Sequence, residues 1–498
     1  MSETSFEFVV AGGGTAGCIV ACRLADRGYS VCLIEAGPAD DGLADVLAID
    51  RWDRLIDGPL DWAFPIAPQE FGNGNIVQSR GRLLGGSSSH NTLVAFRMPD
   101  ADLETWVELG AEGWGPDDVA PLFDRIEATV PFDRPSSGDP YSTAFLEACD
   151  QAGFPTVSFA RNPGAVDGAG WLQLNAKDGM RQSASVAYLH PLGELPRGLV
   201  VMTDTLVRRV LFQNGRATGV ETDKSVVRAE REVVLAGGVF GSAQILLLSG
   251  VGPADHLRDV GIDVIHDLPG VGEHLIDHPE GVTTFRSQRA DLPRLRANYA
   301  DTAMFARLDE AAKAPDIMIH FCIPPYEAMT RAVGYPPIGQ GFSLCPNVAH
   351  ARSEGTLRLR SADPDEPPIV DPRYFTDPDG HDKRVMIEGL KLARHIAAQP
   401  ALRSLIEREA VPGPDIVDDS ALWEVARRTT NTTYHPAGTC RMGRTDDTMA
   451  VVDPELRVRG LAGLRVADGS VFPSMIGVNL CIPTMMIGEK AADLICFR

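Results

Sequence analysis

The first hydrophobic run of the chain is short and is followed at once by glycines. Residues 6–11 (FEFVVA) are mostly β-branched or aromatic, which favours a strand, and residues 12–17 read GGGTAG. Residues 18–27 are typical of a helix, and residues 30–34 form a second apolar run that leads into Glu35. A strand, a glycine turn, a helix, a strand and an acid in this order predict a dinucleotide-binding unit.

The residues of this unit have different expected tasks. Gly12 permits the tight turn, Gly14 lets the backbone approach a pyrophosphate, and Gly17 lets the helix pack closely on the strand. Glu35 is expected to accept a hydrogen bond from a ribose hydroxyl. Because NAD and FAD both carry an adenosine ribose, this motif by itself leaves the identity of the dinucleotide open.

Strands followed by glycine turns and apolar helices occur again later in the chain. Residues 200–235 alternate as strands around the turn QNGRATG, and residues 237–252 read as a glycine turn followed by an apolar helix. Near the C-terminus, residues 464–473 predict a strand that ends in Asp468, and residues 481–495 predict an amphipathic helix. A more polar stretch, roughly residues 283–401, interrupts this rhythm, so we expect an inserted second domain.

Composition narrows the class of partner. The chain of 498 residues has 46 Lys and Arg against 68 Asp and Glu, a net charge of −22, which disfavours nucleic acid or an anionic membrane and mildly favours a cationic small molecule. The N-terminal pattern is not that of a signal peptide, and no apolar run approaches the roughly 18 residues of a membrane span. Nine scattered cysteines without a CxxC pair predict free thiols in a reducing cytoplasm, and no metal site.

Two motifs carry candidate chemistry. In TTYHPAGTCRMG (residues 432–443), Pro436 keeps the preceding His435 out of helical backbone, as in a turn that presents a side chain. On this stretch alone, His435 is equally well explained as a core residue or a catalyst. In GRLLGGSSSHNT (residues 81–92), small residues allow backbone N–H groups to close around a phosphate or an isoalloxazine ring. His90 and Asn91 lead from this cluster into an apolar run, which a flexible linker would not need.

The chain resembles the glucose-methanol-choline oxidoreductases in motifs spread over residues 9–490. These are GGGTAG with Glu35, GRLLGGSSSHN, GSAQILLLSGVGP, LPGVGEHLIDHPEG, YHPAGTCRMG and VADGSVFP. The resemblance implies an α/β fold, α+β overall, with a Rossmann-like FAD-binding domain and an inserted substrate-binding domain built on an antiparallel sheet. We place the FAD-binding domain at residues 1–135, 190–282 and 420–498, and the substrate-binding domain at residues 136–189 and 283–419.

The resemblance also implies roles for individual residues. His435 and Asn479 match the catalytic histidine and asparagine of the family, and His320 in PDIMIHF matches a further active-site histidine. His90 occupies the position that in some members bonds covalently to the 8-methyl carbon of FAD. The residues expected to bind the cofactor are Gly12, Gly14, Thr15, Ala16, Gly17, Glu35, His90, Asn91, Thr92 and Asp468.

Within the family, motifs such as SSSHN and HPEG are most similar to members that act on choline. By that likeness Glu280 balances a substrate ammonium, and Trp52, Tyr299 and Tyr434 form an aromatic cage beside Thr433. The expected reaction is oxidation of a primary alcohol, choline-like or otherwise an amino or ammonium alcohol. The product is an aldehyde, which oxidation of its hydrate converts to an acid. A hydride passes to flavin N5, and O2 is the expected final electron acceptor.

Several alternatives stay open at this point. The arginines 286, 289, 294 and 296, together with the hydroxyl of Thr433, also suit a neutral, zwitterionic or carboxylate-bearing alcohol. A hydroxynitrile lyase on the same scaffold, and a dehydrogenase that uses another acceptor than O2, are further candidates. His274 and His278 have a spacing that zinc ligands share, but Pro279 and the family likeness favour a loop near the flavin. We expect a homodimer in the cytoplasm.

Overall fold

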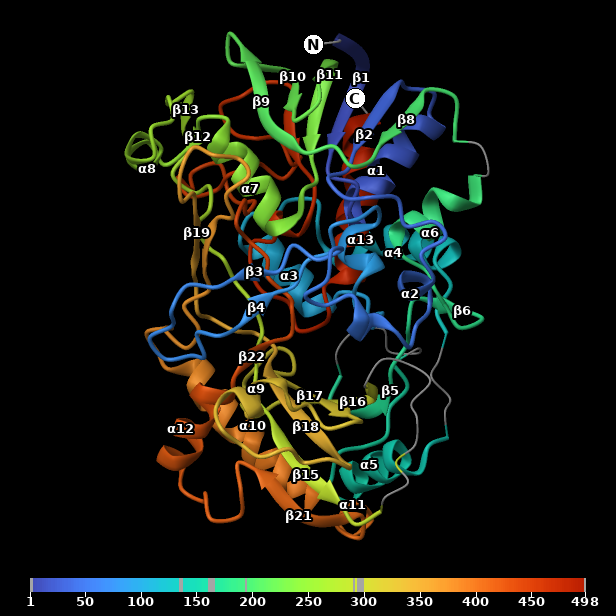
Figure 1. Ribbon diagram of the computed structural model, residues 1–498, viewed down its shortest axis with the longest axis vertical. Coiled ribbons are helices and arrows are strands. Elements are labelled where there is room, and N and C mark those ends of the chain that lie inside the picture. Colours follow the sequence, from blue (N-terminus) through green and yellow to red (C-terminus); the bar gives the residue numbers. More distant parts are fainter. Residues whose placement is uncertain are drawn as a thin grey trace.

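Two β-sheets lie at opposite ends of the molecule and form its framework (Figure 1). The structure is a computed structural model, and it describes residues 3–133, 138–159, 166–192, 195–289, 292 and 300–496. The N-terminus and the C-terminus both lie beside the first sheet, at the top of Figure 1. The fold is mixed α/β, as predicted, with a largely parallel first sheet and an antiparallel second sheet.

The first sheet has the strand order β8-β2-β1-β11-β10-β9, with β23 beside β11. Its strands β8, β2, β1, β11 and β23 are parallel, and β9 and β10 form an antiparallel extension. The hairpin between β9 and β10 turns at Asn214 and Gly215, whose φ angles of 51° and 74° belong to the turn type that Asn-Gly favours. The strands are β1 (Glu3–Ala11), β2 (Val31–Ile34), β8 (Leu199–Met202), β9 (Val207–Gln213), β10 (Arg216–Thr222), β11 (Val226–Leu235) and β23 (Leu464–Val466).

Three helices of the first sheet's domain agree with the sequence pattern in type and place. They are α1 (Thr15–Asp26), α7 (Gly238–Leu248) and α13 (Cys481–Cys496). The strand predicted to end in Asp468 instead ends at Val466, because β23 pairs with β11 at only three residues. After Val466 the chain turns into η4 (Gly469–Val471), where the carboxylate of Asp468 accepts a hydrogen bond from the backbone N–H of Ser470.

The second sheet is antiparallel and has the order β21-β15-β18-β17-β16-β5, with β14 joining β18 to β22. Helices α5 (Pro140–Gln151), α10 (His381–Ala397), α11 (Pro400–Arg403) and α12 (Asp419–Thr429) lie at this end of the molecule (Figure 1). The strands are β5 (Gly168–Trp171), β14 (Pro279–Glu280), β15 (Thr283–Ser287), β16 (Ala300–Ala306), β17 (Ile317–Cys322), β18 (Gly341–Val348), β21 (Ile406–Val411) and β22 (Asn431–Thr432). The domain boundaries given above stay a prediction.

Shorter elements connect the two ends. The helices and 3₁₀ turns among them are α2 (Ala44–Leu47), η1 (Trp52–Arg54), η2 (Gly86–Ser89), α3 (Asp100–Glu108), α4 (Pro116–Thr129), α6 (Ala184–Tyr188), η3 (His190–Leu192), α8 (Ala254–Asp259) and α9 (Ala328–Ala332). The strands are β3 (Phe64–Pro65), β4 (Val77–Gln78), β6 (Ala176–Lys177), β7 (Met180–Arg181), β12 (Val251–Gly252), β13 (His266–Asp267), β19 (Thr356–Arg358) and β20 (Ile369–Asp371).

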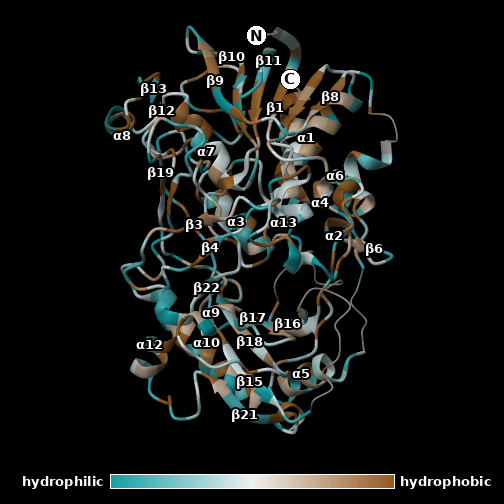
Figure 2. Ribbon diagram, in the orientation of Figure 1, coloured by the Kyte–Doolittle hydropathy of each residue, from teal (hydrophilic) through white to brown (hydrophobic). Residues whose placement is uncertain are grey.

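The apolar core follows the sheets. Figure 2 shows hydrophobic residues along β1 and β8, whereas the peripheral helix α8 is hydrophilic. Residues Val31–Ile34 of β2 are all buried, as expected for a parallel strand covered on both faces. Among the described helices, none combines the length and the apolar character that crossing a membrane requires.

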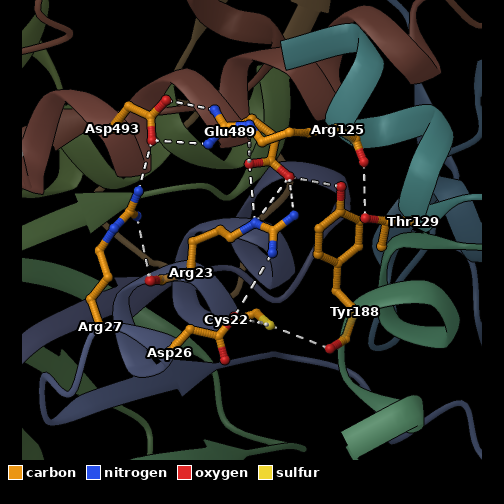
Figure 3. Close-up of polar contacts among 9 residues, drawn as sticks. All are labelled: Cys22, Arg23, Asp26, Arg27, Arg125, Thr129, Tyr188, Glu489 and Asp493. Atoms are coloured by element: carbon orange, nitrogen blue, oxygen red, sulfur yellow. Dashed lines mark hydrogen bonds and ion pairs between the residues drawn. The ribbon is translucent and has the colours of Figure 1, made fainter. Parts of the chain in front are cut away.

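A buried ionic cluster holds α13 against α1 (Figure 3). The carboxylate of Glu489, on α13, is fully buried and accepts hydrogen bonds from Nε and Nη2 of Arg23 on α1, at 3.1 and 2.8 Å. The hydroxyl of Tyr188 donates to the same carboxylate at 2.9 Å, and Arg125 Nε lies 3.7 Å away. Because the first residues of both helices line the cavity described below, this cluster fixes two of its walls relative to each other.

Replacing Glu489 with alanine is expected to lower the free energy of unfolding by about 3 kcal/mol, because Arg23 and Tyr188 lose a buried partner. The measurement is guanidinium unfolding of the purified protein. The matched control is Lys313→Ala, which removes an ion pair with Glu108 whose side chains are both more than half exposed, and which should cost less than about 1 kcal/mol. Equal losses in the two variants would show that the cluster does not stabilise the helix pair.

Candidate active site

One cavity of about 340 Å³ is lined by residues from both sheets and from the loops between them. It extends from the glycine turn after β1 to the histidines near β14 and β17. Apart from Gly17, every described residue predicted for the site lines it, whereas Tyr299 lies outside the described residues. The residues are Gly12, Gly14, Thr15, Ala16, Glu35, Trp52, His90, Asn91, Thr92, Glu280, His320, Thr433, Tyr434, His435, Asp468 and Asn479.

The glycine turn gives one end of the cavity its shape. Gly12 has a φ of 111°, and a Cβ there would lie 2.3 Å from the carbonyl oxygen of Ala236. A Cβ on Gly17 would lie 1.9 Å from the carbonyl oxygen of Gly12, so this glycine faces the turn and not the cavity. Gly14 differs, because no protein atom outside its neighbours lies within 3.8 Å of its Cβ position. Its open face and the N-terminus of α1 suit a phosphate group.

Two carboxylates flank this end. Glu35 accepts hydrogen bonds from the backbone N–H groups of Gly13 and Gly37, each at 2.9 Å. Its burial raises the pKa of the carboxyl group to about 7, although these hydrogen bonds act in the opposite direction. Asp468 accepts hydrogen bonds from the N–H of Gly238 and from the hydroxyl of Ser242, at 2.9 and 2.6 Å. A cavity lined by open glycines, a helix N-terminus and an acid after the second strand fits a dinucleotide.

The second glycine cluster closes over the first. Gly86 has a φ of 53°, and a Cβ on it would lie 2.7 Å from Cα of Gly14, so only glycine fits between the two turns. His90 follows this cluster and is buried, with Nε2 at 3.1 Å from the carbonyl oxygen of Leu55. Burial lowers the pKa of His90 to about 4, so its ring is neutral at physiological pH.

The other end of the cavity holds the predicted catalytic pair. The side-chain nitrogen of Asn479 lies 3.3 Å from Nε2 of His435, and the amide oxygen of Asn479 is buried without a hydrogen-bond partner. On its other side, His435 Nδ1 lies 2.9 Å from Nδ1 of His278 and 2.9 Å from the hydroxyl of Thr433. Burial, with the nearby His278, His320 and Arg80, lowers the pKa of His435 well below its usual value. The imidazole is therefore neutral.

The backbone around His435 is held by polar contacts. Tyr434 has a φ of 62°, which is unfavourable for a residue with a side chain. Arg80 Nη2 donates to the carbonyl oxygen of Tyr434 at 2.5 Å, and the N–H of Tyr434 donates to the hydroxyl of Thr432 at 2.7 Å. The N–H of His435 donates to Oδ1 of Asp277 at 3.1 Å. These contacts maintain the turn that presents the imidazole to the cavity.

Glu280 and His320 lie side by side on the second sheet. Nδ1 of His320 lies 3.2 Å from Oε1 of Glu280. Burial raises the pKa of the Glu280 carboxyl group, and hydrogen bonding to His320 opposes this shift. Trp52, Tyr434 and Tyr326 line the same cavity, so aromatic rings and one carboxylate share its walls.

Four residues with central positions were not predicted from the sequence as site residues. Tyr326 lines the cavity and accepts a hydrogen bond from the amide of Asn431, and Arg80 and Asp277 hold the turn of His435. His278 contacts the ring of His435 directly. For two of them the available signal was the motif HLIDHPEG, in which Asp277 and His278 precede Pro279 and Glu280.

The zinc alternative for His274 and His278 finds no support in the geometry. His274 Nε2 lies 3.0 Å from the carbonyl oxygen of Pro473, and its Nδ1 lies 3.0 Å from Glu354, whereas His278 faces His435. Among the residues that the structure describes, no group of three or more His, Cys, Asp or Glu side chains is arranged to hold a metal ion.

The described arginines near β15 lie outside the cavity lining, so they do not offer a carboxylate a partner there. Arg286 is exposed and forms an ion pair with Glu407 at 3.0 Å, so it belongs to the solvated surface. Neither Arg286 nor Arg289 lines the cavity, and residues 294 and 296 lie outside the described parts of the chain. The described part of this cluster therefore gives the cavity no cation.

Known proteins of one family are similar to this chain over nearly its whole length. Sequence models of the GMC oxidoreductase family match residues 6–280 and 351–488. The chain is 44% identical to choline oxidase from Arthrobacter globiformis, over 99% of this chain and 95% of the relative, and 35% identical to mitochondrial choline dehydrogenase from Homo sapiens, over 99% and 90%. Among solved structures, pyridoxine 4-oxidase from Mesorbium loti superposes with a TM-score of 0.91 at 28% identity, covering 98% of both chains.

The two family matches, the relatives that align over nearly the full chain and a cavity that fits a dinucleotide support one assignment. The chain belongs to the GMC oxidoreductase family and is an FAD-binding oxidoreductase.

Proposed function

We propose that this enzyme oxidises a primary alcohol that carries an amine or ammonium group, choline or a close analogue, to the aldehyde and, through its hydrate, to the acid. One observation carries the proposal: a neutral His435 and the amide of Asn479 face the cavity that also contains the carboxylate of Glu280. The identities of 44% with a choline oxidase and 35% with a choline dehydrogenase support it.

The chemistry divides between cofactor and protein. FAD, when bound in the cavity, supplies the hydride acceptor. His435 accepts the hydroxyl proton of the substrate at Nε2, the atom that lies beside Asn479. The burial that keeps this imidazole neutral also makes it a weak base, so the substrate oxygen needs a hydrogen-bond donor as its charge develops. The side-chain nitrogen of Asn479 is placed to supply it.

The substrate cation faces Glu280 and the aromatic walls. Each well-placed ring contributes roughly 0.5–2 kcal/mol of cation-π attraction, for which Trp52 and Tyr434 are the candidates. Nδ1 of His320 is directed to Glu280, so this histidine offers a donor to the cavity only when its ring carries both protons. When a cationic substrate binds, its charge replaces part of the contact between His320 and Glu280. Glu280 therefore has a partner both with and without substrate.

A second candidate substrate is a neutral or zwitterionic alcohol. The hydroxyl of Thr433 beside His435 and the close structural match to a pyridoxine 4-oxidase favour it. A hydroxynitrile lyase on this scaffold would leave the flavin oxidised throughout turnover. The use of O2 as acceptor, the homodimer and the cytoplasmic location stay predictions.

Anaerobic mixing with choline should bleach the oxidised flavin, and His435→Ala should slow this reduction by roughly 10²- to 10⁴-fold while the flavin spectrum of the resting enzyme is retained. Stopped-flow absorbance at the flavin band measures both rates. His395→Ala removes an exposed histidine on α10 and serves as the control, with an unchanged rate. Persistent yellow colour with every alcohol tested would favour the lyase, and wild-type reduction by His435→Ala would remove this residue from the mechanism.

Glu280→Gln should slow flavin reduction by choline far more than reduction by its neutral isostere 3,3-dimethylbutan-1-ol. Glutamine keeps an oxygen that accepts from His320, so the change removes chiefly the negative charge. The comparison uses the ratio of kcat/KM for the two alcohols in wild type and variant. An unchanged ratio would reject the counter-ion role and favour the neutral-alcohol candidate.

The flavin is expected to be attached covalently through His90, because a buried, neutral imidazole is a nucleophile. After acid precipitation the wild-type pellet should stay yellow, and His90→Ala should release its flavin into the supernatant. Mass spectrometry of the denatured chain checks the added mass. Free flavin in the wild-type supernatant would contradict the link.

A further inference from the structure

His278 immediately precedes β14 and is 2% exposed. Its Nε2 lies 2.8 Å from the carbonyl oxygen of Ala349 and 2.9 Å from that of Ile476. Carbonyl oxygens only accept hydrogen bonds, so Nε2 must carry a proton. Burial lowers the pKa of His278 to about 4, which makes the ring neutral. Its Nδ1 therefore holds a lone pair and can only accept.

That lone pair points at His435. The two Nδ1 atoms lie 2.9 Å apart, so one of them must donate. Since His278 Nδ1 accepts, the proton belongs to Nδ1 of His435. The hydroxyl of Thr433, 2.9 Å from the same atom, accepts as well and donates its own proton to the carbonyl oxygen of His278 at 3.3 Å. Every donor in this group has an acceptor.

We propose that His278 is a positioning residue that fixes the tautomer of His435, so that Nε2 is its proton-accepting atom. In the opposite tautomer, two lone pairs would face each other across 2.9 Å, and the nitrogen beside Asn479 would already carry a proton. This inference rests on the proposed role of His435 as proton acceptor. It adds the reason why the accepting nitrogen is the one that faces the cavity.

Other charged or titratable groups lie near both rings. Around His435 these are His320, Arg80 and Asp277, and none of them contacts its Nδ1. Around His278 they are His350 and Asp102, whose carboxylate accepts from His350 Nε2 and from the N–H of Gly477, each at 2.8 Å. The contacts with Nδ1 of His435 thus come from His278 and from the hydroxyl of Thr433, each at 2.9 Å. A hydroxyl can donate or accept, so Thr433 does not by itself select a tautomer.

A purely structural role for His278 also exists and must be separated from the proposal. Its contact with Ile476 anchors the loop that leads to Asn479, three positions along the chain. That anchoring uses Nε2, whereas the tautomer depends on Nδ1. Two substitutions separate the two atoms: His278→Asn keeps an acceptor oxygen at the Nδ1 position and loses the Nε2 donor, and His278→Gln keeps a donor at the Nε2 position and loses the Nδ1 acceptor.

The test is anaerobic flavin reduction by choline in the holoenzyme, with His435→Ala as reference. The proposal expects His278→Gln to lose roughly 10²-fold or more in the reduction rate, as for loss of a general base, and His278→Asn to lose at least tenfold less than that. Equal losses, or a greater loss in His278→Asn, would overturn the tautomer role. Reduction at the wild-type rate by His435→Ala would instead overturn the proposed function, whatever the variants at position 278 do.

A second measurement is made on the wild-type chain and uses a variant only to assign signals. In holoenzyme labelled with ¹⁵N-histidine, the two nitrogens of His435 have chemical shifts that distinguish N–H from lone pair, and His435→Gln assigns the signals. The expected state is a protonated Nδ1 and an unprotonated Nε2, with the reverse pattern on the ring of His278. A protonated Nε2 on the neutral ring of His435 would overturn the inference.

Discussion

The buried carboxylate of Asp277 joins the segments that shape the end of the cavity where His435 and Asn479 lie. Oδ2 accepts hydrogen bonds from Gln78, Tyr374 and Thr432, and Oδ1 accepts from the backbone N–H of His435. Burial raises the pKa of this carboxyl group, and the hydrogen bonds from Tyr374, Thr432 and Gln78 act in the opposite direction. One acid thus ties its own segment to three others: those of Gln78, of Tyr374 and of the turn that carries Thr432 and His435.

The need to pair every buried donor with an acceptor also explains how the protons are arranged on His278 and His435. His435 and His278 are both buried, and burial makes each neutral, so every ring nitrogen must be either a donor or an acceptor. With fixed carbonyl oxygens at one end of the pair, only one arrangement of protons satisfies all contacts. Buried polar contacts therefore decide which atom faces the substrate, in addition to holding the loops together.

Chain closure brings the two ends of the sequence to one site. The glycine turn after β1 and the first residues of α13 line the same cavity. The contact of Glu489 with Arg23 joins α13 to α1, the helix that follows the glycine turn. Gly488 packs so closely on α1 that a Cβ would lie 2.9 Å from the carbonyl oxygen of Ala16. The cofactor end and the catalytic end are in this way parts of one packed unit.

The sequence by itself determined the elements with local causes. The strand, glycine turn and helix around Gly12, the Asn-Gly hairpin at Asn214 and the family with its cofactor all follow from short-range patterns, because turns and hydrophobic periods depend on neighbouring residues. The length of β23 did not, since a strand extends only as far as its partner pairs with it.

Only the tertiary structure decided which nitrogen of His435 faces the cavity. His278 and His435 are 157 positions apart, and they meet because β14 pairs with β22 and places the residues on either side together. The guanidinium of Arg80 reaches the turn of Tyr434 from a position 354 residues earlier in the chain. Contacts of this kind depend on strand register and side-chain direction, which residue patterns do not encode locally. The sequence pattern therefore pointed to His435, whereas the contacts of its two ring nitrogens exist only in the folded chain.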